Sequence, residues 1–84
     1  MVDNSRDIIM YSTTWCADCR RTKRFLDERG VPYVWIDIGE DAEAAREVTR
    51  INGGMRSVPT LVFADGSVLV EPSNKELAQK LGLG

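Results

Sequence analysis

Two cysteines three positions apart are the residues of this sequence best suited to chemistry. Cys16 and Cys19 are the only cysteines in the 84-residue chain, and the chain contains no histidine. A thiol pair at this spacing can alternate between a dithiol and a disulfide, or can supply two ligands to a metal ion. The lack of histidine removes imidazole as a general base and as a metal ligand, which excludes cysteine–histidine hydrolases and most zinc sites.

The elements around the pair suit redox chemistry. The apolar run at residues 7–12 is rich in strand-forming residues and predicts a buried first strand. Residues 16–29 contain no Gly or Pro, and their apolar and small side chains recur at spacings of three and four, which predicts an amphipathic helix that ends at Gly30. The free backbone N–H groups at the start of this helix would point at the Cys16 sulfur and favour its thiolate form.

The spacing also predicts separate roles for the two thiols. Cys19 lies one helical turn beyond Cys16, where positions i and i+3 share a face, and we expect it to be the more buried of the two. Cys16 is then predicted to attack a substrate disulfide, and Cys19 to resolve the mixed disulfide that results.

Two further elements continue the chain in an α/β order. Residues 31–38 are β-branched and aromatic, which predicts a second strand, covered on both faces, after a right-handed crossover. Residues 41–51 predict a short helix that ends at the glycines of residues 52–54. The side of this helix expected to pack inward carries Ala42, Ala45, Val48 and Thr49.

The last third of the chain predicts a hairpin and a final helix. Two strand-like runs, residues 58–64 and 67–71, flank Asp65 and Gly66, a strong signal for a tight turn. Ser73 or Asn74 then caps a helix that runs to about residue 81. The resulting order, β-α-β-α-β-β-α, predicts one α/β domain over residues 1–84, with a four-stranded mixed sheet and helices on both faces.

Three residues close to the cysteines are candidate substrate contacts. Trp15 precedes Cys16 and is expected to form an exposed aromatic platform. Asp18 places a carboxylate between the cysteines, where it opposes a thiolate while meeting the helix N-terminus favourably. Arg20, four residues after Cys16, either supports the thiolate or an acidic thiol, or is an ordinary solvated cation on the helix surface.

Pro59 is unusual because it begins a predicted strand, in the segment Val58-Pro59-Thr60. Proline is tolerated there at an edge, in trans, or in a cis turn. A cis Pro59 would leave the backbone groups of Val58 free to hold an incoming peptide or thiol as an added strand.

Taken together, these motifs resemble the glutaredoxin family, and within it the mycoredoxin-like small redoxins of the thioredoxin-like superfamily. The resemblance extends over nearly the whole chain. It rests on YSTTWCADC at residues 11–19, NGGMRSVPT at residues 52–60, FADGS at residues 63–67 and EPS at residues 71–73.

The resemblance implies a site and an electron donor. It implies Cys16 as the nucleophile, Cys19 as the resolving thiol and a cis-proline segment facing them. Its candidate substrate-binding residues are Trp15, Asp18, Arg20, Arg56, Val58, Pro59 and Thr60. It also implies reduction by a low-molecular-weight thiol, mycothiol or glutathione, with no bound cofactor or metal.

Two departures from the glutaredoxin pattern bear on that donor. Ala17 and Asp18 stand between the cysteines, where glutaredoxins commonly have Pro-Tyr. Residues 71–74 read Glu-Pro-Ser-Asn, where glutaredoxins hold the γ-glutamyl end of glutathione with a Gly-Gly-Asp-like turn. This difference fits a thiol without a γ-glutamyl group, such as mycothiol, and equally a redoxin reduced by a flavoprotein reductase.

Net charge and hydropathy limit the kinds of binding partner that we expect. The net charge of −2 argues against nucleic acid or an anionic membrane. No apolar stretch is long enough to span a bilayer, and the polar N-terminus lacks the apolar core of a signal peptide. We expect a cytoplasmic monomer that acts on disulfide-containing client proteins. Two alternatives stay open: an electron donor dependent on thioredoxin reductase, and a dimer that binds iron–sulfur clusters or metal through Cys16.

Overall fold

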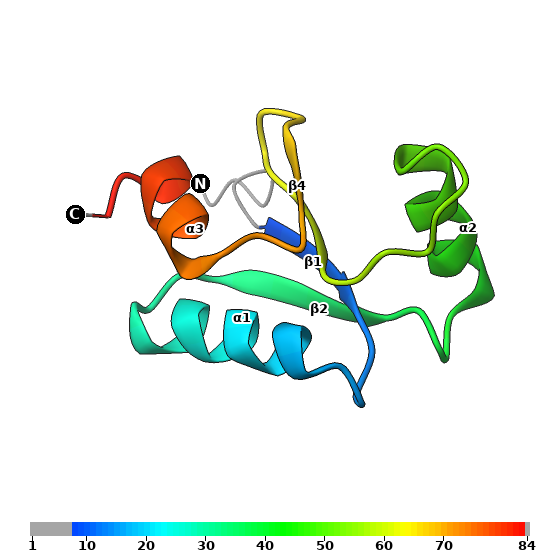
Figure 1. Ribbon diagram of the computed structural model, residues 1–84, viewed down its shortest axis with the longest axis horizontal. Helices are drawn as coiled ribbons and strands as arrows, with labels where there is room; N and C mark the ends of the chain where they lie inside the picture. Colours follow the sequence, from blue (N-terminus) through cyan, green and yellow to red (C-terminus); the bar gives the residue numbers. More distant parts are fainter. Residues whose placement is uncertain (1–7, 84) are drawn as a thin grey trace, which may run out of the picture.

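Strands and helices alternate along the chain, and a hairpin followed by a helix completes it (Figure 1). The structure is a computed structural model and describes residues 8–83. Its elements are β1 (Ile8–Ser12), α1 (Ala17–Glu28), β2 (Tyr33–Asp37), α2 (Ala42–Ile51), β3 (Thr60–Val62), β4 (Val68–Val70) and α3 (Asn74–Leu81). The predicted order is confirmed, although Asp7, the predicted first residue of the first strand, lies outside the described residues.

The four strands form one mixed sheet in the order β2-β1-β3-β4. β1 and β2 run parallel, with Ile8 opposite Tyr33, because α1 carries the chain back across the sheet between them. β1 pairs with β3 and β3 pairs with β4 in antiparallel fashion. The predicted mixed sheet is therefore confirmed, and β1 is one of its two central strands.

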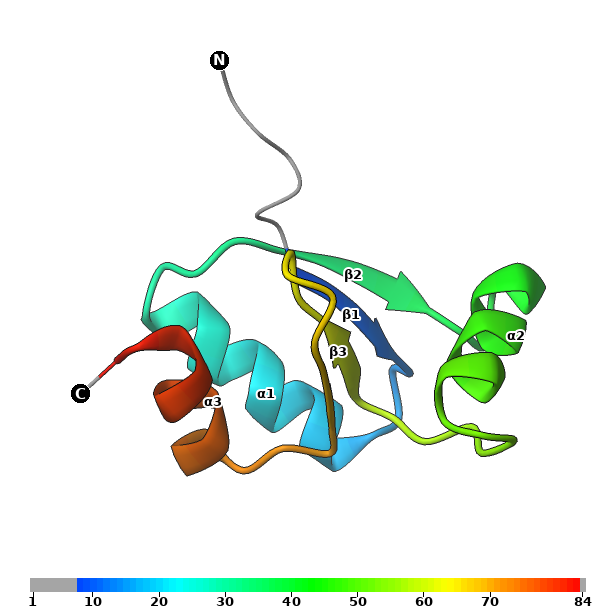
Figure 2. The same cartoon turned by 90° about the horizontal axis from the view of Figure 1, so that it is seen from above.

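Helices cover both faces of the sheet, with α1 and α3 on one face and α2 on the other (Figures 1 and 2). Alternate side chains of β1 serve the two faces, as the period of a strand requires. The buried residues on the face of α1 and α3 are Ile8, Met10, Phe25, Leu26, Leu61, Phe63 and Leu77. Those on the face of α2 are Tyr11, Ile38, Ala44 and Val48.

Two predictions about burial are wrong in part. β2 is only partly covered: Tyr33 and Trp35 pack against one cluster and Ile36 against the other, but none of its residues is fully buried and Val34 is 43% exposed. α2 packs through the predicted Val48 and Ala45 and also through Ala44, whereas the predicted Ala42 is exposed. The docked face of α2 is set by where the helix meets Tyr11 and Ile38 on the sheet, which its own sequence does not specify.

The predicted turn and cap of the last third are both confirmed. Gly66 closes the β3–β4 connection with a φ of 87°, in the left-handed region where glycine is favoured. Its N–H donates to the carbonyl of Phe63. Ser73 caps α3 by accepting the N–H of Glu76, whose carboxylate accepts the N–H of Ser73 in return.

Candidate active site

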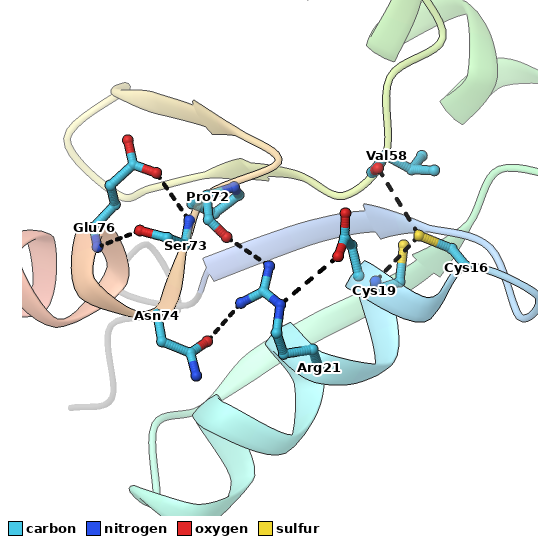
Figure 3. Close-up of polar contacts among 9 residues, drawn as sticks. Cys16, Cys19, Arg21, Val58, Pro72, Ser73, Asn74 and Glu76 are labelled. Atoms are coloured by element: carbon cyan, nitrogen blue, oxygen red, sulfur yellow. Dashed lines mark hydrogen bonds and ion pairs between the residues drawn. The ribbon is translucent and has the colours of Figure 1, made fainter.

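Cys16 lies at the N-terminus of α1, where the chain leaves the edge of the sheet. It is the N-cap residue of this helix, and its Sγ accepts the backbone N–H of Cys19 at 3.1 Å (Figure 3). The helix dipole places its positive end at the same sulfur. The Cys16 side chain is half-buried, so its sulfur is within reach of solvent.

Cys19 lies behind Cys16 and is fully buried against the sheet. Burial raises the pKa of the Cys19 thiol well above its ordinary value, and a hydrogen bond to Cys16 raises this pKa further. Both cysteines are free thiols in this structure. The site thus pairs an accessible sulfur at a helix N-terminus with a buried sulfur whose pKa is raised.

The segment of Val58 and Pro59 lies next to the thiol pair, on a different part of the chain from α1. The Cys16 thiol lies 3.9 Å from the carbonyl oxygen of Val58, which it meets as a weak donor (Figure 3). The Val58–Pro59 peptide bond is cis, one of the two alternatives considered from the sequence. Pro59 is fully buried, whereas Val58 is half-buried. The structure therefore brings residues from distant parts of the chain to one sulfur.

Thr60 belongs to the same segment, but its side chain points into the protein interior. Its side chain is fully buried; its hydroxyl donates to the carbonyl of Ser57 at 2.7 Å and accepts from the amide of Asn52 at 3.1 Å. Both bonds hold the loop between α2 and β3. The Thr60 side chain therefore supports the loop, and the exposed surface of the segment is formed by other groups.

Trp15 and Arg20 lie on the solvent side of the thiol pair. Trp15 is 73% exposed, as the sequence predicted. The ring edge lies over Gly39, where an added Cβ would meet it at 3.1 Å. The guanidinium of Arg20 donates to the carbonyl of Thr14 at 3.0 Å. Arg20 thus holds the loop that leads into Cys16.

Asp18 faces Arg21, a residue that sequence reasoning did not single out. A carboxylate oxygen of Asp18 lies 3.8 Å from Nε of Arg21. The same guanidinium donates to the carbonyl of Pro72 at 2.8 Å and to the side-chain oxygen of Asn74 (Figure 3). Arg21 therefore ties the helix of the cysteines to the loop before α3. Its position in an ordinary basic run of α1 carried no signal for this contact.

Arg56 makes no hydrogen bond to either cysteine among the described residues, and it lies on the α2 side of the molecule. It lines an open groove with residues of α2 and of the loop before it. Within residues 8–83 the side chains form no group of three or more potential metal ligands.

A four-stranded mixed sheet with a C-x-x-C pair at the N-terminus of its first helix defines a protein of the thioredoxin-like fold. The solved structure of methanoredoxin from Methanosarcina acetivorans shares this fold with a TM-score of 0.78 and 29% identity, over 92% of this chain and 86% of that one. The family model for glutaredoxin matches residues 8–69. The chain belongs to the glutaredoxin family, whose members are thiol oxidoreductases.

Two relatives refine this assignment. A glutaredoxin-family protein of Mycobacterium tuberculosis is 43% identical over 74 residues, which cover 88% of each chain. Mycoredoxin 1 of Corynebacterium glutamicum is 36% identical over 75 residues, which cover 89% of this chain and 92% of the relative. The resemblance found in the sequence motifs is thereby confirmed. Family membership also implies a low-molecular-weight thiol and disulfides as reaction partners.

Proposed function

We propose that this protein reduces disulfides of client proteins, or mixed disulfides with a small thiol, through two successive exchanges at Cys16 and Cys19. The observation that carries the proposal is the asymmetry of the pair. The Cys16 sulfur is accessible and accepts a backbone N–H at a helix N-terminus, whereas Cys19 is buried and retains its proton. An accessible thiolate in front of a protonated thiol is the arrangement that such exchange requires.

In the first exchange the Cys16 thiolate attacks one sulfur of the substrate disulfide. A bond forms between that sulfur and Cys16, the substrate S–S bond breaks, and the other substrate sulfur leaves as a thiolate that takes a proton. The carbonyl of Val58, next to the Cys16 sulfur, is positioned to accept a backbone N–H of the substrate.

In the second exchange Cys19 attacks Cys16. The Cys19 thiol loses its proton and its sulfur bonds to the Cys16 sulfur. The disulfide bond between Cys16 and the substrate breaks, and the substrate sulfur leaves as a thiolate that takes a proton, so that the substrate is fully reduced. Two molecules of a low-molecular-weight thiol then reduce the Cys16–Cys19 disulfide and are themselves joined as a disulfide. Each cycle thus moves two electrons from the small thiol to the substrate.

We favour mycothiol as the electron donor. We also propose that the protein acts as a monomer in the cytoplasm. The loop before α3 lacks the glycines of the Gly-Gly-Asp-like turn, and its Pro72 carbonyl and Asn74 side chain are engaged by Arg21. One relative carries the name mycoredoxin. The test offers the oxidised protein mycothiol, glutathione or a flavoprotein reductase in parallel. Fastest reduction by mycothiol supports the choice, and fastest reduction by either of the others rejects it.

A single-cysteine series tests the roles of the two thiols. Cys16→Ser is expected to abolish all disulfide exchange, because it removes the attacking sulfur. Cys19→Ser is expected to keep activity on mixed disulfides with a small thiol, and to lose it on substrates whose release requires a second protein thiol. Full activity of Cys16→Ser in a coupled assay would reject the proposal.

A further inference from the structure

A groove lined by three arginines lies on the α2 side of the molecule. It is an open groove of about 790 Å³, within the range of roughly 300–1,000 Å³ typical of ligand sites. We call it the α2 groove, and its charged lining residues are Glu40, Arg46, Arg50 and Arg56. Ile38, Ala42 and Ala45 supply apolar surface between these charges.

The lining of the α2 groove holds more arginines than carboxylates, and Glu43 and Glu47 next to it offset two of these arginines. Three arginines and one glutamate line it, whereas the chain has a net charge of −2. Arg50 is paired with Glu47, but Arg46 lies 4.0 Å from Glu43 in a loose, exposed contact. Arg56 makes no ion pair or side-chain hydrogen bond within residues 8–83. Arg56 therefore offers an unpaired guanidinium to an anionic partner, and Arg46 offers one that is only loosely held.

The α2 groove is continuous with the surroundings of Cys16. Gly39 lines the groove and lies under the ring edge of Trp15, the residue before Cys16. Arg56 also lines the groove. It precedes Val58 by two residues, and the carbonyl oxygen of Val58 contacts the Cys16 sulfur. A chain bound at the cysteines can therefore extend directly into the groove.

The residues around the α2 groove are those of a protein interface. Trp15 is 73% exposed and Met55, next to Arg56, is 63% exposed. Tryptophan, methionine and arginine are the side chains enriched where proteins meet one another. This composition favours a segment of a client protein over a small thiol as the occupant of the groove.

We propose that the α2 groove binds an acidic segment of the client protein, next to the disulfide that Cys16 attacks. This proposal rests on the proposed disulfide reductase function and adds a substrate class to it: clients with aspartates or glutamates close to the reducible cysteine. Carboxylates of that segment would accept hydrogen bonds from Arg46 and Arg56, and electrostatic attraction would speed its encounter with the site.

The test compares two peptides, each with a disulfide flanked on one side by a run of residues. The run is glutamate in one peptide and glutamine in the other. The wild-type protein is expected to reduce the acidic peptide with a kcat/KM on the order of tenfold higher at low salt, with the preference shrinking as salt screens the charges.

Variants locate the preference in the groove. Arg46→Gln/Arg56→Gln is expected to lower the ratio of the two kcat/KM values by about three- to tenfold, since each exposed contact contributes modestly. Arg46→Lys/Arg56→Lys should restore most of the ratio, because the charge is kept. Arg24→Gln is the matched control for Arg56→Gln alone, because each removes one exposed arginine and Arg24 lies in α1, on the other face of the sheet.

The possible results distinguish a failure of the groove proposal from a failure of the proposed disulfide reductase function. Equal reduction of both peptides by the wild type rejects the acidic segment but leaves the reductase function standing. A loss in Arg24→Gln as large as in Arg56→Gln also rejects the proposal, because net charge alone would then explain the preference. A groove variant that slows reduction of the oxidised protein by glutathione, but keeps the peptide preference, assigns the groove to a small acidic thiol and rejects a client segment. Failure to reduce either peptide rejects both proposals.

Discussion

At the scale of single residues, the environment of each sulfur separates the two thiols. Both belong to the same helix, three positions apart, but only Cys19 is enclosed by the sheet and the helix. Burial disfavours a charged sulfur, whereas a helix N-terminus favours one. The chemical asymmetry of the pair therefore follows from one turn of helix.

The raised pKa of Cys19 makes the stability of the reduced protein dependent on alkaline pH. The folded protein keeps Cys19 protonated above the ordinary thiol pKa of 9.0, whereas the unfolded chain ionises there. This contribution to stability is complete below that pH and is lost as the pH rises toward the higher folded pKa. The free energy of unfolding should fall by up to about 1.4 kcal/mol per pH unit in that range.

Urea titrations of the reduced protein between neutral pH and about pH 11 measure this dependence. Cys19→Ala is the control, because it lacks the titrating thiol and keeps both tyrosines, whose pKa values are raised as well. Its stability should fall less steeply above pH 9.0 than that of the wild type. Parallel profiles for the two proteins would contradict the assigned burial of the Cys19 thiol.

At the scale of elements, Arg21 is the contact that joins α1 to the segment before α3. It reaches the carbonyl of Pro72 and the side chain of Asn74, more than fifty positions further along the chain. That segment leads directly into the capping box of α3. The position of α3 against the helix of the cysteines is thus supported by a charged side chain as well as by apolar packing.

Arg21→Gln should loosen this junction without unfolding the protein. We expect a loss of about 0.5–1 kcal/mol in the free energy of unfolding, because the contacts are charged but partly solvated. Hydrogen exchange should become faster at residues 73–77, the first turn of α3. Arg24→Gln, on the same helix but with no such contact among the described residues, should change neither quantity. Identical behaviour of the two variants would show that the Arg21 contact does not stabilise the junction.

At the scale of the whole molecule, the sheet divides the interior into two unequal clusters. The cluster under α1 and α3 holds the larger side chains, and the cluster under α2 is small. Val48 is fully buried in the small cluster, and the loop after α2 leads to the cis-proline segment. Packing of α2 therefore helps to position both Val58 and the α2 groove.

Val48→Ala should cost more stability than the same substitution at Val70, which is 42% exposed. We expect a loss of about 1.5–3 kcal/mol at Val48, from lost burial and the cavity left behind, and less than about 1 kcal/mol at Val70. Thermal or urea unfolding of both variants measures the difference. Equal losses would mean that α2 is not packed tightly against the sheet.

The sequence by itself determined the parts that depend on neighbouring residues. The strand–helix junction at Cys16, the turn at Gly66 and the Ser73 cap were all predicted and found. Each is specified within a few positions, by the period of apolar side chains, by a residue that tolerates a positive φ, or by a side chain that caps free N–H groups. The order of elements, and hence the fold, follows from these local signals.

The tertiary structure alone decided the parts that join distant residues. It placed Val58 against Cys16 across 42 positions, turned Ala44 and not Ala42 inward, left β2 at the sheet edge, and brought Arg21 to Asn74. None of these has a local pattern, because each depends on how separate elements dock in three dimensions. The thiol pair is thus readable in the sequence, whereas the surface that faces it exists only once the chain has folded.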